Sequence, residues 1–414
     1  NPSKKHFGLS PYDEESFWFK PYMDDEVCWT GTNNGSWDEY KQRQYPSFDG
    51  WNSISEQTLL DDDPDNDLTP SGAKKLFTWE HRKDGQIQFP DINFDAGFGG
   101  PVPFISSRFG NLRFFVSARQ EQDMYLYEVS SPGLYRQSYL LKLTSDISKK
   151  SKLTYTYYSG NMEGTTLSRG GGTSIVNDVW DLASEVNSTG FTMPWRLFTN
   201  EYWSPTKIQN STHGLKYTNS LTSDSYFDLL LKVDLKEYTT GHGARRDTST
   251  SYSIFGSGED EWFADEAPVG FFGSPLFSVE GRLAFGGAIS TSRDSSIVSS
   301  YTIKGNYTKQ INNNNQLKMG GEFILSSLDL KYGSQNEFLP SGNYWSLMNV
   351  NPYRLSFFAQ DKLEYKGFVA IAGLNLDVIN PNGEWYVVDL YEDDFFSSNY
   401  TSSEEGTFEK IKLD

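Results

Sequence analysis

The sequence predicts an all-β fold: an antiparallel transmembrane β-barrel, of which this chain supplies about ten strands, with long extracellular loops. Three observations lead to this prediction. Apolar and polar residues alternate along many segments, and alternation with period two is typical of a strand with one apolar and one more polar face. These segments come in pairs joined by short turns. The connections between the pairs are long, and short turns at one end with long loops at the other are typical of outer-membrane barrels.

The chain divides into two predicted domains. Residues 1–90 are expected to form an irregular loop or insertion region, which we place outside the cell, and residues 91–414 to form the barrel strands. Apolar residues in the first region follow neither a helical nor a strand period for long. Its best helix candidate is 71–82, because Thr69 is a suitable capping residue and Pro70 fits the first turn of a helix.

The predicted strands follow one another as hairpins. In the clearest one, 301–332, Tyr301 and Ile303 alternate with Thr302 and Lys304, and an asparagine-rich turn separates the two strands. The other hairpins pair 92–103 with 112–125, 135–145 with 153–159, 212–220 with 226–238, and 354–364 with 368–379. The long connections lie at about 160–211, 239–297, 333–352 and 380–409. Long loops without secondary structure are usually functional in compact domains.

Composition limits the classes of protein. Aromatic residues make up 16% of the chain, which is too many for a disordered segment. The 36 basic and 55 acidic residues give a net charge of −19, which argues against nucleic acid as a partner. A single cysteine, Cys28, excludes an intrachain disulfide. No run of about 18 apolar residues occurs, so no transmembrane helix is expected.

Several segments resemble a known family. The run RLSFFAQDK at 354–362 and the run YKGFVAIAGLNLD at 365–377 resemble the barrel hairpin of TonB-dependent outer-membrane receptors. Further segments resemble the Oar-like branch of that family, whose members join a carboxypeptidase-regulatory-like domain to a plug and a barrel. These segments are 99–103, 110–115 and 141–145, together with 6–8 and 48–52 in the first region.

The resemblance implies a receptor or transporter that takes up a ligand across the outer membrane of a Gram-negative-type bacterium. Its partners would be outer-membrane lipid, an unknown small or oligomeric ligand, and a TonB-type energy-coupling complex that acts through the plug region. Two departures stand out. Asn375 replaces the usual arginine of the hairpin motif. No plug is recognisable and the strands are fewer than the family's roughly 22, so we expect part of a barrel without its plug.

An acidic run offers the candidate metal site. Carboxylate oxygens at alternate positions suit Ca²⁺, but the EF-hand spacing fails because Pro64 interrupts the run and no glutamate occupies the twelfth position. The alternative is a solvated acidic loop. The candidate calcium ligands are Asp61, Asp62, Asp63, Asp65 and Asp67.

Loop tryptophans are the candidate ligand contacts. The alternatives are an interfacial girdle of aromatic residues and packing between loops. These candidates are Trp180, Trp195, Trp203, Trp262 and Trp345. No catalytic residue and no cofactor are predicted, so we expect the protein not to be an enzyme. The competing hypothesis is a secreted all-β carbohydrate-binding protein or glycosidase, in which a second sheet would cover the apolar strand faces.

Overall fold

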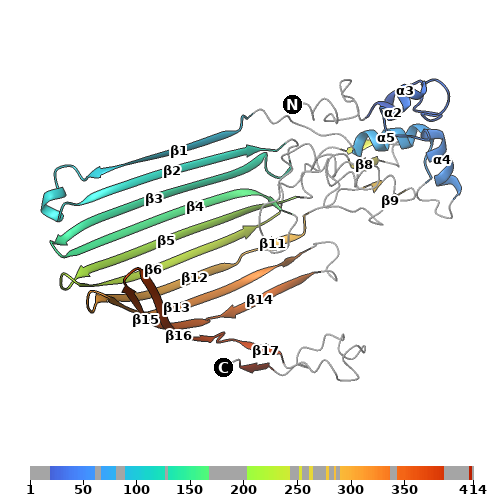
Figure 1. The fold of residues 1–414 in the computed structure, drawn as a ribbon. Helices are drawn as coiled ribbons and strands as arrows, with labels where there is room; N and C mark the ends of the chain where they lie inside the picture. Colours follow the sequence, from blue (N-terminus) through green and yellow to red (C-terminus); the bar gives the residue numbers. More distant parts are fainter. Residues whose placement is uncertain are drawn as a thin grey trace.

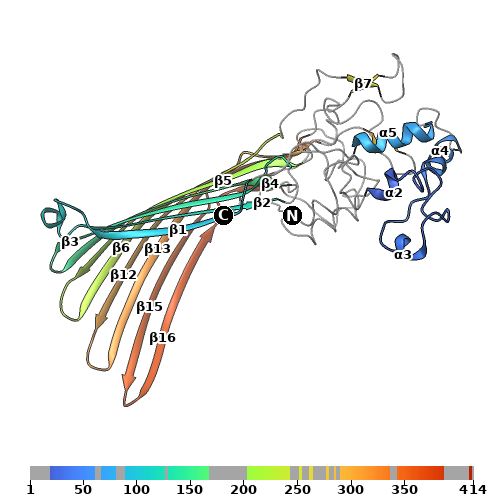
Figure 2. The ribbon, with the colours of Figure 1, turned by 90° about the horizontal axis from the view of Figure 1, so that it is seen from above.

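The computed structural model centres on a 12-stranded antiparallel sheet, so the all-β prediction is confirmed. Figures 1 and 2 show a curved, twisted sheet whose edges are β1 (Ile92–Pro101) and β16 (Phe368–Asn380). The structure describes residues 19–60, 67–80, 89–125, 129–166, 203–242, 290–335 and 343–386, with the short segments 251–253, 261–263, 277–278, 284–285 and 410–412.

The strands follow sequence order across the sheet. Between the two edges lie β2 (Arg113–Met124), β3 (Gly133–Ser148), β4 (Ser151–Thr166), β5 (Ser204–Ser220), β6 (Ser225–Thr240), β11 (Ser292–Asp294), β12 (Ile297–Gln310), β13 (Asn315–Ser334), β14 (Tyr344–Val350) and β15 (Tyr353–Tyr365). Three two-stranded pairs complete the described strands: β7 (Ser251–Ser253) with β8 (Glu261–Phe263), β9 (Phe277–Ser278) with β10 (Ala284–Phe285), and β17 (Glu384–Tyr386) with β18 (Lys410–Lys412).

Two of the long strands each consist of two segments with a short break between them. The segments β11 and β12 both lie between β6 and β13, and the break between them is bridged by the Ser295 amide, which donates to the Lys331 carbonyl at 2.9 Å. Similarly, β14 and β15 pair with successive parts of β13, and the Ser326 amide donates to the Pro352 carbonyl at 2.9 Å. Twelve segments therefore form ten long strands, as predicted.

The sequence expectations about the connections were wrong in part. Of the predicted connection 160–211, residues 160–166 belong to β4 and residues 204–211 to β5, and β11 lies within the predicted connection 239–297. The segment 333–352 was predicted as a loop, but β13 continues to Ser334 and residues 344–350 form β14. Pro352 has no amide hydrogen and interrupts the strand, which hid the continuation from β14 into β15.

The hairpin turns have the local chemistry that tight turns require. Lys366 and Gly367 both have positive φ, 47° and 83°, as in the type I′ turn that suits the twist of two-residue hairpins. In the turn between β12 and β13, the Asn312 side chain accepts hydrogen bonds from the amides of Asn314 and Asn315, both at 2.9 Å. These tight turns lie at one end of the sheet in Figure 1, and the long connections lie at the other.

Four helices occupy the described part of the first region. They are α2 (Lys20–Met23), α3 (Glu39–Gln42), α4 (Trp51–Leu60) and α5 (Pro70–Glu80), and a 3₁₀ turn η2 (Ser106–Phe109) follows β1. Only α5 was predicted. The Thr69 hydroxyl accepts a hydrogen bond from the Gly72 amide at 3.1 Å, which confirms the predicted cap. The division at residue 90 stays a prediction. Within the described residues, no helix is both long and apolar enough to cross a membrane.

Residues 19–80, which we call the helical unit, enclose an aromatic core. The Trp51 indole nitrogen donates to the Tyr22 carbonyl at 2.9 Å, and the Trp51 ring lies 5.2 Å from that of Phe77. Gly50, with φ +93°, permits a close crossing of two chain segments, because a Cβ there would lie 2.5 Å from the Gly31 amide nitrogen. The helical unit lies at the long-connection end of the sheet in both views (Figures 1 and 2).

Candidate functional site

The cross-strand register divides the sheet into two chemically different faces. Ile303 on β12 lies opposite Leu231 on β6 and Phe323 on β13, and residues paired in this way share one face. We call the face that carries Ile303 the apolar face and the opposite one the polar face. The same row of the apolar face continues through Leu215, Tyr155, Leu143 and Phe114 on one side and through Leu355 and Val378 on the other.

Charge follows the same division. In β1–β6, β12, β13, β15 and β16, twelve of fifteen Lys and Arg and nine of thirteen Asp and Glu lie on the polar face. Charges on the apolar face occur only towards the ends of the strands. They are Glu163, Lys207, Glu237, Asp329 and Lys331 towards the long connections, and Lys309 and Asp361 towards the turns.

The apolar face ends at one continuous row of polar residues. Gln120, Gln137, Asn161, Gln209 and Glu237 are successive partners across five strands, β2 to β6. Two residues nearer the turns on the same face, β2 carries an alanine, β3 a tyrosine and β6 a leucine, whereas β4 and β5 carry serines. We call this row the polar boundary. Between it and the turn ends of the strands lies a band without charged side chains that is several residues long along each strand.

Protein does not cover the apolar face within the described residues. Ile303, Leu231 and Leu376 are 51%, 42% and 61% exposed. The other sheets in the described part are the three two-stranded pairs, and none of them pairs with the large sheet. The sandwich expected of the secreted carbohydrate-binding alternative is therefore not found in the part of the chain that the structure describes.

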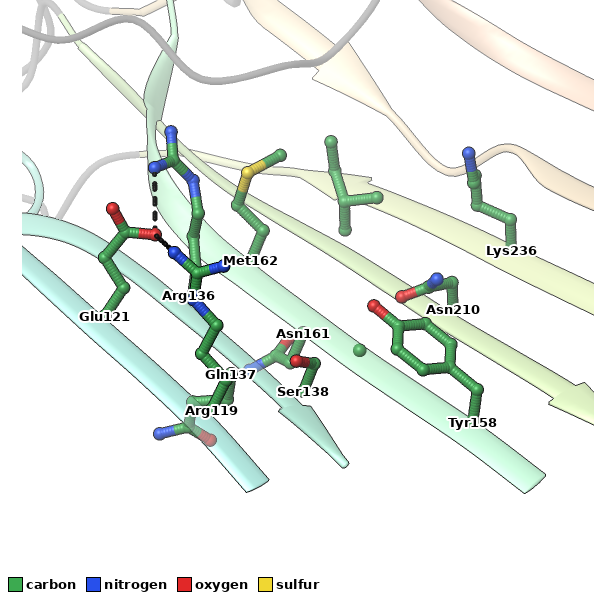
Figure 3. Close-up of a pocket in the computed structure, with 12 residues that line it drawn as sticks. Arg119, Glu121, Arg136, Gln137, Ser138, Tyr158, Asn161, Met162, Asn210 and Lys236 are labelled. Atoms are coloured by element: carbon green, nitrogen blue, oxygen red, sulfur yellow. Dashed lines mark ion pairs between the residues drawn. The ribbon is translucent and has the colours of Figure 1, made fainter. Parts of the chain in front are cut away.

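The polar face contains a hollow of about 320 Å³, which we call the polar hollow (Figure 3). It spans β2 to β6 in the half of the sheet that lies towards the long connections. Ten of its lining residues lie on the polar face: Arg119, Glu121, Arg136, Ser138, Tyr158, Gly160, Met162, Ile208, Asn210 and Lys236. Gln137 and Asn161 also line it, although by register they belong to the polar boundary of the opposite face.

Positive charge is in excess in the polar hollow. Glu121 accepts ion pairs from both Arg136, at 3.4 Å, and Arg119, at 3.9 Å, as the dashed lines in Figure 3 show. Arg136 also lies 3.8 Å from Asp123, at the rim. Lys236 makes no ion pair with any residue that the structure describes. Three cations therefore face two carboxylates, which favours the binding of an anion.

Glycine keeps the floor of the polar hollow open. A Cβ at Gly160 would lie 2.2 Å from the Asn210 side-chain oxygen and 3.1 Å from the Tyr158 hydroxyl. The absence of a side chain lets the Asn210 amide lie over the β4 backbone beside Tyr158 (Figure 3). Amide and hydroxyl groups at such a site can both donate and accept hydrogen bonds.

The predicted calcium ligands are largely outside the described residues. Asp61, Asp62, Asp63 and Asp65 lie there, and Asp67 is an exposed residue just before α5. No cluster of three or more potential metal ligands occurs among the described residues. The calcium site stays a prediction.

The predicted ligand-contacting tryptophans are not brought together at the polar hollow. Trp180 and Trp195 lie outside the described residues, and Trp262 falls in β8. Trp203 is 3% exposed beside the start of β5. Trp345 lies on the side of the apolar face, beyond the polar boundary, with the Lys331 ammonium 5.1 Å from its ring. This position fits the interfacial-girdle alternative for Trp345.

The residues of the polar hollow were not identified from the sequence. Alternation alone places Arg119 and Lys236 on the polar sides of their strands. It does not show that β2 and β6 present these residues at the same height, because that depends on the register of four successive strand pairs. A search for basic residues on predicted polar faces would have found them only as scattered candidates.

Comparison with known proteins gives structural similarities only. No family model matches the chain, and no curated protein has a matching sequence. The structure is similar to the FrpB iron transporter from Neisseria meningitidis (F3-3 variant), with 12% identity, a TM-score of 0.40, and coverage of 70% of this chain and 39% of that one. It is also similar to a mutant of the ferric enterobactin receptor PfeA from Pseudomonas aeruginosa, with 10% identity, a TM-score of 0.41, and coverage of 73% and 38%. The ferric-catecholate import receptor Fiu from E. coli K12 is similar too, with 10% identity, a TM-score of 0.42, and coverage of 81% of this chain and 47% of that one. The chain spans less than half the length of each of these proteins.

Proposed function

We propose that this chain forms part of the wall of an outer-membrane receptor that takes up a ligand across the outer membrane of a Gram-negative-type bacterium. One observation carries the proposal. The apolar face is uncharged between the ends of its strands and has no protein cover in the described residues, whereas the polar face holds most of the charges. A sheet with these two faces fits a barrel wall with lipid outside and a polar lumen inside.

The lengths of the strands support the same proposal. A barrel strand needs about 9–11 residues to cross the bilayer. The β4 and β13 strands have 16 and 20 residues, so they are long enough to cross and to continue beyond the membrane. The polar boundary is where we place the outer limit of the lipid, and the long connections lie beyond it.

The turn ends of the strands β12 and β15 lie at different heights of the sheet. Lys304 on β12 and Ser356 on β15 both pair with Glu322 of β13, so they lie at the same height of the register. The β12 strand ends six residues beyond Lys304, at Gln310, and β15 ends nine residues beyond Ser356, at Tyr365. A stagger of this kind arises where strands are tilted, as they must be in a barrel.

The finer features of the proposal rest on the sequence resemblance. These are membership of the TonB-dependent receptors and of their Oar-like branch, energy from a TonB-type complex acting through a plug, and a small or oligomeric ligand held by the outer loops. We propose that the polar hollow also contacts that ligand, because the hollow lies on the proposed lumen side of the sheet and in the half nearest to the loops. The role proposed for the protein is transport rather than catalysis.

The proposal is tested by membrane insertion. The full chain, refolded with phosphatidylcholine vesicles, is expected to float with the vesicles in a density gradient. The vesicles are also expected to protect the β-strands from protease while the helical unit stays accessible. A monomer that stays soluble and folded without lipid or detergent would contradict the proposal.

A further inference from the structure

The polar face is basic although the chain as a whole is strongly acidic. Twelve Lys and Arg and ten Asp and Glu of the long strands, Asp294 of β11 included, lie on that face, an excess of two positive charges, whereas the chain carries a net charge of −19. Positive charge is thus concentrated on the side that we propose lines the lumen. An aqueous cleft lined by one sign of charge raises the local concentration of ions of the opposite sign.

The polar hollow contains one of the cations of the polar face that no described carboxylate neutralises. Arg119 and Arg136 share Glu121, and Lys236 has no carboxylate partner among the described residues. An ammonium without a carboxylate partner is available to an incoming anion, and hydrogen bonds to charged groups contribute more than neutral ones.

The remaining lining residues indicate the chemistry of the rest of the ligand, to which the anionic group is attached. Tyr158, Asn210 and Ser138 provide hydroxyl and amide groups, which match a ligand with several hydroxyls. Met162 and Ile208 add apolar surface on one side. A volume of about 320 Å³ is at the lower end for small-molecule sites, so it suits one unit of a ligand rather than a large molecule.

We infer that the polar hollow binds the carboxylate or phosphate group of a polyhydroxylated ligand unit, with Lys236 as the anion contact and its cross-strand neighbour Asn210 as a hydroxyl contact. This inference rests on the proposed function, because it requires the polar face to line the lumen of the barrel. Gly160 is the positioning residue, since it leaves room for the Asn210 side chain over β4.

The test uses the full chain reconstituted in lipid, with glucuronate, glucose 6-phosphate and glucose as probes in ligand-observed NMR. Both anions are expected to bind at least tenfold more tightly than glucose, and added salt is expected to weaken them. If only one anion binds, that arm identifies carboxylate or phosphate as the recognised group. Failure of both anions to bind better than glucose overturns the inference.

Variants locate the binding. Lys236→Gln is expected to reduce anion affinity about tenfold. The matched control, Lys142→Gln, changes an exposed lysine on the same face outside the hollow and is expected to leave affinity unchanged. Gly160→Ala is expected to weaken both anions by displacing Asn210, while the strand content measured by circular dichroism stays the same. Equal effects of Lys236→Gln and Lys142→Gln would overturn the inference. A chain that does not enter lipid would instead count against the proposed function.

Discussion

The helical unit and the sheet differ in where their apolar residues lie: those of the helical unit are mostly buried, and many of those of the sheet are exposed. Of the fifteen buried apolar residues in the described part, eleven belong to the helical unit: Phe19, Tyr22, Val27, Cys28, Trp37, Phe48, Trp51, Ile54, Leu68, Ala73 and Phe77. The sheet is far larger, yet Leu231, Ile303 and Leu376 of its apolar face stay exposed. The helical unit makes its own core, whereas the sheet presents an apolar surface that needs an apolar solvent.

The comparison also shows why the same residue types have different consequences in the two regions. In the helical unit, Phe48 packs 4.9 Å from Trp51, and the cost of losing a ring is a cavity. On the sheet, removal of an apolar side chain leaves no cavity, but in the proposed barrel an introduced charge would lie in lipid. Predictions for the two regions should therefore be measured in different assays.

The largest effect is expected in the helical core. Trp51→Ala removes a fully buried ring and its hydrogen bond to the Tyr22 carbonyl, so it should lower the free energy of unfolding of the helical unit by about 3–5 kcal/mol. Limited proteolysis should then cleave residues 19–80 while the sheet stays intact. Tyr40→Ala is the control, because Tyr40 is 77% exposed and its loss should change little. Loss of the sheet together with the helical unit would show that the two are not separate in stability.

A smaller effect distinguishes the two faces of one strand. Leu231 lies on the apolar face and Leu230 on the polar face, where its cross-strand partners are Lys216 and Lys304. Leu231→Glu should destabilise the protein in lipid by about 2 kcal/mol, because a carboxylate would face hydrocarbon. Leu230→Glu should be tolerated, because two ammonium groups flank it. Urea titration in vesicles measures both variants, and equal losses would contradict the assignment of the faces.

A substitution in the turn between β15 and β16 should lower the free energy of unfolding by a smaller amount. Gly367 has φ +83°, so Gly367→Ala forces a side chain into the left-handed region at a cost of about 1 kcal/mol. Gly305→Ala is the matched control, since Gly305 has open space around its Cα and its φ is not positive. The same urea titration compares the two, and a stable Gly367→Ala variant would argue against a type I′ turn.

The smallest effect concerns pH and is confined to the helical unit. Burial raises the pKa of the Cys28 thiol, and the nearby Lys74 ammonium opposes this shift only in part. Burial also raises the pKa of Tyr22. Since both groups hold their protons more tightly when folded, their contribution to stability is complete below the unfolded pKa values, about 8.5 and 10, and is lost at higher pH.

The measurement is the stability of residues 19–80 as the pH rises from 8 to 11, monitored by alkylation of Cys28. The thiol should react slowly in the native chain and rapidly in urea, and protection should decline as the pH rises. Cys28→Ala lacks the thiol, so limited proteolysis replaces alkylation as its readout, and this variant should flatten the lower part of the pH dependence. A pH-independent stability of the helical unit would contradict the burial of these two groups.

Much of the sheet could be predicted from the sequence, because alternation and turn chemistry are local. Asparagine residues at 312–315 and the Lys366–Gly367 pair marked hairpin turns where the structure has them. The Thr69 cap and Pro70 likewise marked the start of α5. The segment β14 was missed, since Pro352 interrupts the pattern that it shares with β15.

The helical core and the polar hollow could not be predicted, for the same physical reason. Both depend on contacts between residues far apart in the sequence, such as Trp51 with Phe77, or Arg119 and Lys236 at one height of the sheet. The buried residues of α4 follow a helical spacing, Trp51, Ile54, Ser55 and Thr58, but two of them are polar, so apolar periodicity did not mark this helix.

The most direct test of the central claim measures what the two faces of one strand touch. In a Cys28→Ala background, single cysteines at positions 301–307 of β12 carry a nitroxide, and the collision rates with oxygen and with a water-soluble nickel complex are measured in lipid vesicles. We predict a period of two, with oxygen access highest at Tyr301, Ile303, Gly305 and Tyr307, and nickel access highest at the residues between them. Uniform access along the strand, or a period of two with the reverse sense, would contradict a lipid-facing apolar face.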